Sequence, residues 1–210
     1  MKAKVMIVDD QKISRQLFES FVNKSRNFEL VKSIESAGLV DVYLARFKVD
    51  LIIMDVVMSD GSNGLTACEY VKKNYPDIKI IVVTSMPEVS FINRAKEIGV
   101  ESFWYKEEES APLLDIMNRT MAGESVYPDS TPSVELGNIY SNELSSSELA
   151  VLRELTTGAG NDDIADRLSI SVNTVKTHIQ HMLEKTGFAN RTELAIEARV
   201  RGVVIPLSSD

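Results

Sequence analysis

The chain has 210 residues, 44% of them hydrophobic and 26% charged, which is typical of a soluble globular protein with one or two domains. A single cysteine and two histidines exclude a disulfide framework and metal sites that need several of either residue. The net charge of −8 argues against a generally basic nucleic-acid-binding surface, although not against a small local one. The apolar runs are too short to span a bilayer and the N-terminus does not resemble a signal peptide, so we expect a cytoplasmic protein without membrane contact.

Residues 1–123 alternate between short apolar runs and amphipathic stretches. The run from Ile80 to Val83 contains no polar residue, which is typical of strands buried on both faces of a parallel sheet. Strict alternation of five strands with helices predicts a doubly wound α/β domain with a five-stranded parallel sheet. The predicted strands are 4–8, 28–34, 51–54, 79–83 and 102–105, and the predicted helices are 13–23, 38–47, 65–74, 90–98 and 111–122.

After Gly123 the pattern changes. Residues 125–143 contain two prolines and several serines without clear periodicity, which predicts a mobile linker, placed at 124–143. From Leu144 to the end of the chain only helical patterns follow, so we predict an all-α four-helix domain over 144–210. Its helices are predicted at about 146–155, 162–168, 172–185 and 191–201. The predicted caps are a capping box at Ser145–Glu148, N-caps at Asn161 and Ser171, and a C-terminal glycine at Gly187.

Polar side chains follow four of the predicted strands at the point where each strand ends. They are Asp9 and Asp10 after the first strand, Asp55 after the third, Thr84 after the fourth and Lys106 after the fifth. Ligands bind outside the carboxyl ends of the strands in such a sheet, so these side chains should converge. Clustered carboxylates need a neutralising cation, and Mg²⁺ suits oxygen ligands and brings a phosphoryl group with it. A carboxylate beside this cation and a lysine can act as a nucleophile toward phosphorus, which predicts an aspartyl phosphate.

These positions lie in four motifs: Val8-Asp9-Asp10, Ile53-Met54-Asp55-Val56-Val57-Met58, Val82-Val83-Thr84-Ser85 and Phe103-Trp104-Tyr105-Lys106. With them, residues 2–123 resemble the receiver domain of two-component response regulators. The resemblance implies a flavodoxin-like strand order 2-1-3-4-5 and makes Asp55 the phosphoacceptor. It also implies that Mg²⁺ is held by Asp9, Asp10, Asp55 and the backbone carbonyl of Val57.

The same resemblance assigns roles to the last two strands. Thr84 would contact one phosphoryl oxygen and Lys106 another, and Thr84 and Phe103 would be the switch residues. Two segments depart from the family pattern. Ser59 stands where a proline is usual, in a loop that is one residue longer, and Glu107-Glu108-Glu109 follow Lys106 where a proline is typical.

The third helix of the C-terminal domain has two distinct faces. Its core-facing positions are predicted to be Val175, Ile179, Met182 and Leu183. The opposite face carries Asn173, Lys176, Thr177 and Gln180, a small polar stripe with one lysine and no acid. Such a stripe is more often a solvated face than a surface that recognises DNA, so sequence context has to decide.

That context comes from the run Ile170-Ser171, Thr174-Val175-Lys176 and His178, together with Glu148, Gly158, Lys185 and Arg191. With these residues, positions 144–204 resemble the helix-turn-helix domain of the LuxR/NarL type. The resemblance implies that the third helix enters the major groove and that the fourth serves in dimer contacts. The implied DNA-binding residues are Asn173, Thr174, Lys176, Thr177, His178, Gln180 and Arg191. The departures are Ser147, Gly160 and Thr186, which replace a common arginine, serine and leucine, and Gln180, which replaces a basic residue.

The order of receiver, linker and helix-turn-helix is typical of a response regulator of the NarL/FixJ class. We therefore expect a phosphorylation-controlled transcription factor rather than an enzyme, with a sensor histidine kinase, promoter DNA and a second copy of the chain as partners, and RNA polymerase as a further candidate.

Three alternative functions are compatible with parts of this pattern. A nucleotide- or flavin-binding protein would need a glycine-rich turn after the first strand, where Asp9-Asp10-Gln11-Lys12 stands. A Mg²⁺-dependent phosphatase of the haloacid dehalogenase type would carry a second aspartate two residues after Asp55. A regulator that acts through protein contacts without phosphorylation stays open, because of Glu107–Glu109 and the weakly basic C-terminal domain.

Overall fold

The computed structural model describes residues 2–86, 88–106, 113–129 and 131–204. The chain divides into two compact units, the first made of Met1–Ser85 and Val89–Asp129, the second of Met86–Glu88 and Ser130–Asp210. No helix in the described ranges is long and apolar enough to cross a membrane.

The first unit is built on a five-stranded parallel sheet with the order β2-β1-β3-β4-β5. This order and the doubly wound fold confirm the prediction. The strands are β1 (Ala3–Val8), β2 (Phe28–Ile34), β3 (Leu51–Asp55), β4 (Lys79–Thr84) and β5 (Ser102–Tyr105). Every residue of β3 is buried, as expected for a strand covered on both faces.

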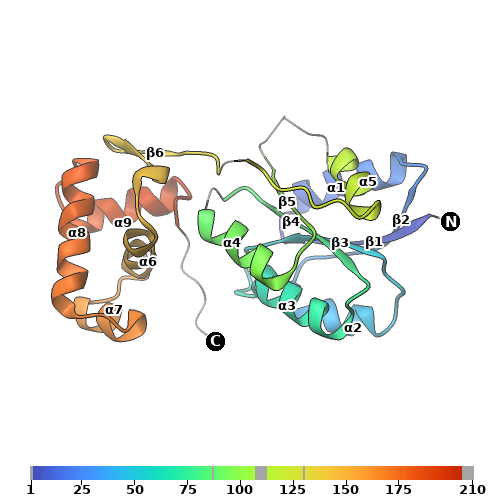
Figure 1. Ribbon diagram of the computed structural model, residues 1–210, viewed down its shortest axis with the longest axis horizontal. Helices are drawn as coiled ribbons and strands as arrows, with labels where there is room; N and C mark the ends of the chain where they lie inside the picture. The colour runs from blue at the N-terminus through green and yellow to red at the C-terminus, as the bar shows by residue number, and fades with distance from the viewer. Residues whose placement is uncertain (1, 87, 107–112, 130, 205–210) are drawn as a thin grey trace. The chain divides into compact units, whose positions relative to one another are not determined.

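Helices cover both faces of this sheet (Figure 1). They are α1 (Lys12–Lys24), α2 (Val40–Leu44), α3 (Gly64–Asn74), α4 (Val89–Ile98) and α5 (Leu113–Met121). One face packs Val5, Ile7 and Ile53 against Phe18 of α1 and Met117 of α5. Because side chains alternate along a strand, the intervening residues of β1, β3 and β4 form the core beneath the other helices.

The second predicted helix, at 38–47, is wrong in length. The structure forms a 3-10 turn, η1 (Ala37–Leu39), and a short α2 that ends at Leu44. The Ser36 side chain accepts a hydrogen bond from Gly38 N and so begins the turn. Arg46 N and Phe47 N both donate to the Tyr43 carbonyl, so the chain after Leu44 closes in a turn and does not continue the helix.

The second unit has four helices in its described part, as predicted: α6 (Ser146–Leu155), α7 (Asn161–Leu168), α8 (Val172–Thr186) and α9 (Arg191–Val200). The capping box at the start of α6 is confirmed, because Glu148 N donates to Ser145 Oγ and Ser145 N donates to the Glu148 carboxylate. The Ser171 cap of α8 and the left-handed Gly187 at its end are confirmed as well. Val175, Ile179 and Met182 are buried in this unit's core.

The segment expected to lack regular structure contains a small hairpin. It consists of β6 (Glu135–Leu136) and β7 (Ile139–Tyr140), followed by a 3-10 turn, η2 (Ser141–Glu143). Leu136 is fully buried in the core of the second unit, and Asn138 N donates to the Thr186 carbonyl at the end of α8. Strands of two residues are too short to produce a sequence periodicity, so this hairpin could not be predicted.

The predicted Asn161 cap of α7 is wrong. The N-cap is Gly160, which has no side chain, and Asp163 accepts a hydrogen bond from Gly160 N instead. Asn161 is the first residue of the helix itself, and its side chain accepts a hydrogen bond from Arg191. A serine is the better N-cap residue, so α7 begins with a weak cap.

We expect Gly160→Ser to stabilise the protein by about 0.5 kcal/mol, because the hydroxyl can cap α7 and the backbone of Gly160, with φ −73°, suits any residue. Gly160→Ala is the control, since alanine restricts the unfolded chain equally without a cap. The free energy of unfolding of Gly160→Ala should be about 1 kcal/mol lower than that of Gly160→Ser. Scanning calorimetry of the full chain measures the difference. Equal stability of the two variants would contradict the assignment of position 160 as the N-cap.

Candidate functional site

The polar residues at the strand ends meet at one edge of the first unit. Asp9 and Asp10 follow β1, Asp55 ends β3, and carboxylate oxygens of all three lie within 4.8 Å of one another. Thr84 ends β4, and its carbonyl accepts a hydrogen bond from Lys106 N at 2.9 Å. The register of the parallel strands therefore brings together residues that are up to 97 positions apart in the chain.

Lys106 forms ion pairs with two of the three carboxylates. Its ammonium Nζ lies 2.6 Å from Asp55 Oδ2 and 2.7 Å from Asp9 Oδ2. All three side chains are buried or nearly so, with exposed fractions of 10% for Lys106, 4% for Asp55 and 0% for Asp9. Burial lowers the pKa of Lys106, but the two carboxylates outweigh it and raise the pKa overall. The ammonium group thus stays charged at neutral pH.

Asp55 is poised to lose its proton near neutral pH. Burial raises its pKa to about 6, while Lys106 lowers it and the negative charge of Asp9 raises it further. Its Oδ1 accepts a hydrogen bond from Val56 N at 2.7 Å, which fixes the orientation of the carboxylate. Above this pKa, Asp55 is an oriented, buried carboxylate beside an ammonium group.

Asp10 offers an oxygen that nothing else in the described chain uses. Its Oδ1 is buried without a hydrogen-bond partner, whereas its Oδ2 accepts a hydrogen bond from Ser59 N at 2.8 Å. A buried carboxylate oxygen without a partner is costly, and a bound cation would satisfy it. The Ser59 contact also explains one departure from the family pattern, because a proline there has no N–H to donate.

The loop after β3 is folded tightly against the site. Val57 forms an antiparallel bridge with Asn63, and the Asn63 side chain caps α3 by accepting from Leu65 N. A Cβ at Gly64 would overlap the carbonyl oxygen of Asp55, so only glycine fits there. The first turn of α3 can therefore pack directly behind Asp55.

Sequence reasoning missed one residue of this site. Arg15 on α1 donates through Nη1 to the carbonyls of Asp9 at 2.6 Å and Asp10 at 2.9 Å. It thereby fixes the backbone that carries both acids. Its position, one turn into the helix that follows the acidic pair, was the available signal. The predicted loop at Glu107–Glu109 lies outside the described residues.

Phe103, the predicted switch residue, is 1% exposed on β5. Its ring makes an edge contact with Tyr105, with the centroids 5.2 Å apart. Tyr105 directly precedes Lys106, so the ring contact and one peptide bond link Phe103 to the acidic site.

In the second unit, α8 exposes the predicted polar face. Asn173, Lys176, Thr177 and Gln180 are exposed, whereas Thr174 and His178 are partly buried. Gln180 Nε2 donates to Glu184 Oε1 at 2.8 Å, so reaching a ligand would require it to leave this partner.

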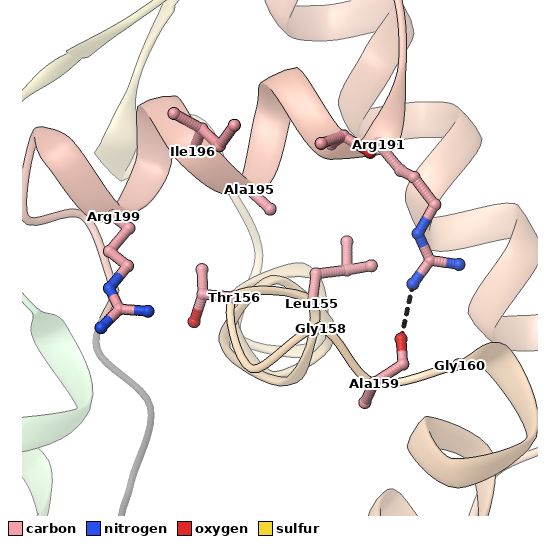
Figure 2. Close-up of a pocket in the computed structure, with 10 residues that line it drawn as sticks. Leu155, Thr156, Gly158, Ala159, Gly160, Arg191, Ala195, Ile196 and Arg199 are labelled. Atoms are coloured by element: carbon pink, nitrogen blue, oxygen red, sulfur yellow. Dashed lines mark hydrogen bonds between the residues drawn. The ribbon is translucent and has the colours of Figure 1, made fainter.

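Arg191 is held inside its own unit rather than extended. Its Nη1 donates to Asn161 Oδ1 and its Nη2 to the Ala159 carbonyl, both at 2.7 Å. Figure 2 shows the second bond at one end of a groove of about 430 Å³ between α9 and the turn after α6. Arg191 therefore ties the start of α9 to the start of α7.

Comparisons with known proteins cover both units. Residues 5–118 match the response regulator receiver domain family, and residues 142–198 match the family of bacterial regulatory proteins called the luxR family. The response regulator protein VraR of Staphylococcus aureus strain NCTC 8325 is 30% identical over 204 residues, which cover 94% of this chain and 97% of VraR. VraR of Staphylococcus epidermidis strain ATCC 12228 matches to the same extent.

Solved structures show the same fold. An RcsB–DNA complex has a TM-score of 0.62 and 21% identity, and the match covers 95% of this chain and 98% of that one. RcsB from Salmonella enterica serovar Typhimurium, bound to promoter rprA with the phosphomimetic BeF3-, has a TM-score of 0.60 and 21% identity, covering 96% and 100%.

The raised pKa of Asp55 predicts a pH-dependent stability. The folded chain binds the Asp55 proton more tightly than the unfolded chain does. Proton binding therefore stabilises the folded state fully below pH 3.8, and this stabilisation is lost as the pH rises through about 6. At about 1.4 kcal/mol per unit, wild type should lose up to about 3 kcal/mol relative to Asp55→Asn between pH 4 and pH 7. Urea unfolding in EDTA measures this difference. Exposed Asp77→Asn is the control, and parallel curves for wild type and Asp55→Asn would contradict the expectation.

Proposed function

This chain belongs to the response-regulator family, as a receiver joined to a LuxR-type DNA-binding domain, and we propose that phosphorylation of Asp55 controls its binding to promoter DNA. It is a DNA-binding transcriptional regulator and not an enzyme. The observation that carries the proposal is the buried ion pair of Lys106 with Asp55 beside two further carboxylates. The proposed division is a receiver at 1–123, a linker at 124–143 and a DNA-binding domain at 144–210, acting in the cytoplasm.

The phosphoryl group would come from a histidine of a sensor kinase. An oxygen of the Asp55 carboxylate attacks phosphorus, the phosphorus–nitrogen bond breaks, and the imidazole of the kinase leaves with its electron pair. Lys106 pairs with one oxygen of the transferred group, and the Thr84 hydroxyl donates to another. Because Lys106 Nζ already lies 2.6 Å from Asp55 Oδ2, the lysine side chain needs to move only a little to pair with the phosphoryl group on Asp55.

The acidic cluster fits a divalent cation, which we propose is Mg²⁺. The partnerless Oδ1 of Asp10 and the carboxylates of Asp9 and Asp55 are oxygen donors of the kind this ion prefers, with the Val57 carbonyl as a further proposed ligand. When bound, the ion would neutralise the carboxylates and the incoming phosphoryl oxygens. The chain itself contributes the orientation, since Ser59 and Arg15 fix Asp10 and its backbone.

We expect acetyl phosphate and Mg²⁺ to add one phosphoryl group to the chain, at Asp55. Intact mass measures it, hydroxylamine should remove it, and Asp55→Asn and EDTA should each prevent it. Asp77→Asn, an exposed aspartate, is the matched control. Labelling that persists in Asp55→Asn would overturn the assignment. DNA binding that does not change on phosphorylation would favour the alternative of a regulator that acts through protein contacts.

Ser59→Pro should weaken Mg²⁺ binding several-fold. The substitution removes the N–H that donates to Asp10 Oδ2 and orients this carboxylate. Loss of such a charge-assisted hydrogen bond should reduce the free energy of Mg²⁺ binding by about 1–2 kcal/mol. Ser59→Ala is the control because it keeps the N–H and should bind Mg²⁺ like wild type. Fluorescence of Trp104, two residues before Lys106, follows the titration. If alanine and proline weaken binding equally, the serine hydroxyl rather than the backbone N–H is responsible.

The exposed face of α8 is the proposed surface that recognises DNA. Lys176 can donate to guanine N7 and O6 in the major groove, and Gln180 can pair with adenine after leaving Glu184. Thr174 and His178, at the edges of this face, and Asn173 and Thr177 are the other proposed contacts. The RcsB structures that share this fold are bound to DNA, which supports the assignment.

A homodimer is the proposed DNA-binding form. Ile196, which lines the groove of Figure 2, is 56% exposed, and Val200, one turn later on α9, is 77% exposed. Apolar side chains in this register form a stripe that a second copy can cover. The domain carries ten acidic and seven basic side chains from Ser141 onward, so attraction to phosphates is weak and a second half-site adds needed affinity. RcsB is described as dimers on DNA.

For an operator selected from genomic DNA fragments, Lys176→Ala should lower the binding affinity by about 1–3 kcal/mol and relax specificity at one base pair. Binding to operators with single-base changes measures this. Arg191→Ala serves as the comparison. It should weaken binding to all sequences alike, because Arg191 supports the domain through Asn161 and Ala159 and is proposed to contact the phosphate backbone. A uniform loss for Lys176→Ala would mean that α8 does not read bases through this residue.

A further inference from the structure

The chain that follows α5 covers an edge of the receiver sheet. Strand β5 is last in the order 2-1-3-4-5, so one of its edges has no neighbouring strand. Phe103 N donates to the Val126 carbonyl at 2.8 Å, and Val126 N donates to Ser102 Oγ at 3.1 Å. Ser102 is itself fully buried, with its Oγ 2.7 Å from Thr120 Oγ1 of α5. The first residues of the proposed linker are therefore anchored to β5.

Tyr127 completes this anchor through three different contacts. Its ring stacks on Phe103, with the centroids 6.4 Å apart and the planes at 22°. Its hydroxyl donates to the Val100 carbonyl at 2.7 Å, and Lys96 Nζ of α4 lies 5.0 Å from the ring centroid. Burial raises the pKa of Tyr127, so the hydroxyl keeps its proton for this bond at neutral pH.

Two ring contacts, one peptide bond and one ion pair join Tyr127 to the acidic site. The Phe103 ring is 1% exposed and touches Tyr127 and, edge-on, Tyr105. Tyr105 is also 1% exposed and precedes Lys106, which pairs with Asp55. Since these rings are closely packed, Phe103 cannot change position without changing the surface on which Tyr127 rests.

We propose that Tyr127 is a positioning residue that couples the phosphorylation state of Asp55 to the anchorage of the linker. The inference rests on the proposed function. Phosphorylation replaces the single negative charge of the Asp55 carboxylate with the nearly two negative charges of a phosphoryl group, which lie further from the Asp55 backbone. The resulting pull on Lys106 is transmitted along β5 to Phe103. Movement of Phe103 removes the ring contact of Tyr127, and residues 126–127 then leave the edge of β5. The linker gains freedom at the end joined to the receiver, without any change in the hairpin that anchors it to the second unit.

Hydrogen exchange of the full chain tests the coupling. The Phe103 amide should be protected in the unphosphorylated protein and should exchange at least tenfold faster after treatment with acetyl phosphate and Mg²⁺. Tyr127→Ala should exchange fast in both states. Tyr127→Phe keeps the stacked ring and loses only the bond to Val100, so it should retain a phosphorylation-dependent difference. Tyr70→Ala, which removes a tyrosine from α3, is the matched control and should behave like wild type.

Intact mass of each sample separates the possible outcomes. If the wild-type chain carries the phosphoryl group and the exchange of Phe103 is unchanged, the coupling is overturned while the proposed function stands. If the wild-type chain gains no phosphoryl group, the proposed function fails and the coupling fails with it. Circular dichroism checks that Tyr127→Ala is folded. If it is not, wild type and Tyr127→Phe carry the test, and equal exchange in both states of each overturns the proposal.

Discussion

Three carboxylates at the ends of β1 and β3 repel one another, and the contacts around the site in the first unit depend on compensating this repulsion. Buried acids are tolerated only when charges and hydrogen bonds compensate them. Lys106 supplies the positive charge, Val56 N orients Asp55, and Ser59 N holds Asp10. The compensation is incomplete, because Asp55 keeps a raised pKa and one oxygen of Asp10 has no partner in the described chain. Incomplete compensation is what makes this edge receptive to a cation and to a phosphoryl group.

The architecture and the acidic cluster could be predicted from the sequence because each depends on a regular pattern. Continuous apolar runs indicate buried parallel strands, and residues at strand ends must converge once the strands are parallel. Asp9, Asp55 and Lys106 were found in this way. Arg15 was not, because its side chain donates to the backbone carbonyls of Asp9 and Asp10. Ser59 stood out only as a departure from the family pattern, and its contact with Asp10 could not be predicted because its own backbone N–H makes it. Contacts of the backbone leave little trace in residue type.

Local signals were less dependable in the second unit. Ser145, Ser171 and Gly187 act as expected because their side chains or backbone angles act within one helical turn. Asn161 is a good capping residue by type, yet the helix begins one residue earlier and Arg191 engages its side chain. A contact with a residue 30 positions away therefore overrides the local preference. The roles of Lys176 and its neighbours in DNA recognition stay predictions, because exposure alone does not identify a ligand.

The covered edge of β5 has a practical consequence for work with the receiver alone. A strand at the border of a sheet offers unpaired N–H and C=O groups to other chains, and proteins usually block such borders. Here Val126 and Tyr127 provide the block, by pairing with Phe103 and shielding its ring. A fragment cut after Gly123 would present this apolar border to its neighbours and be prone to associate. Extending the fragment to Asp129 retains the cover, so the choice of end point decides whether the isolated receiver behaves as a monomer.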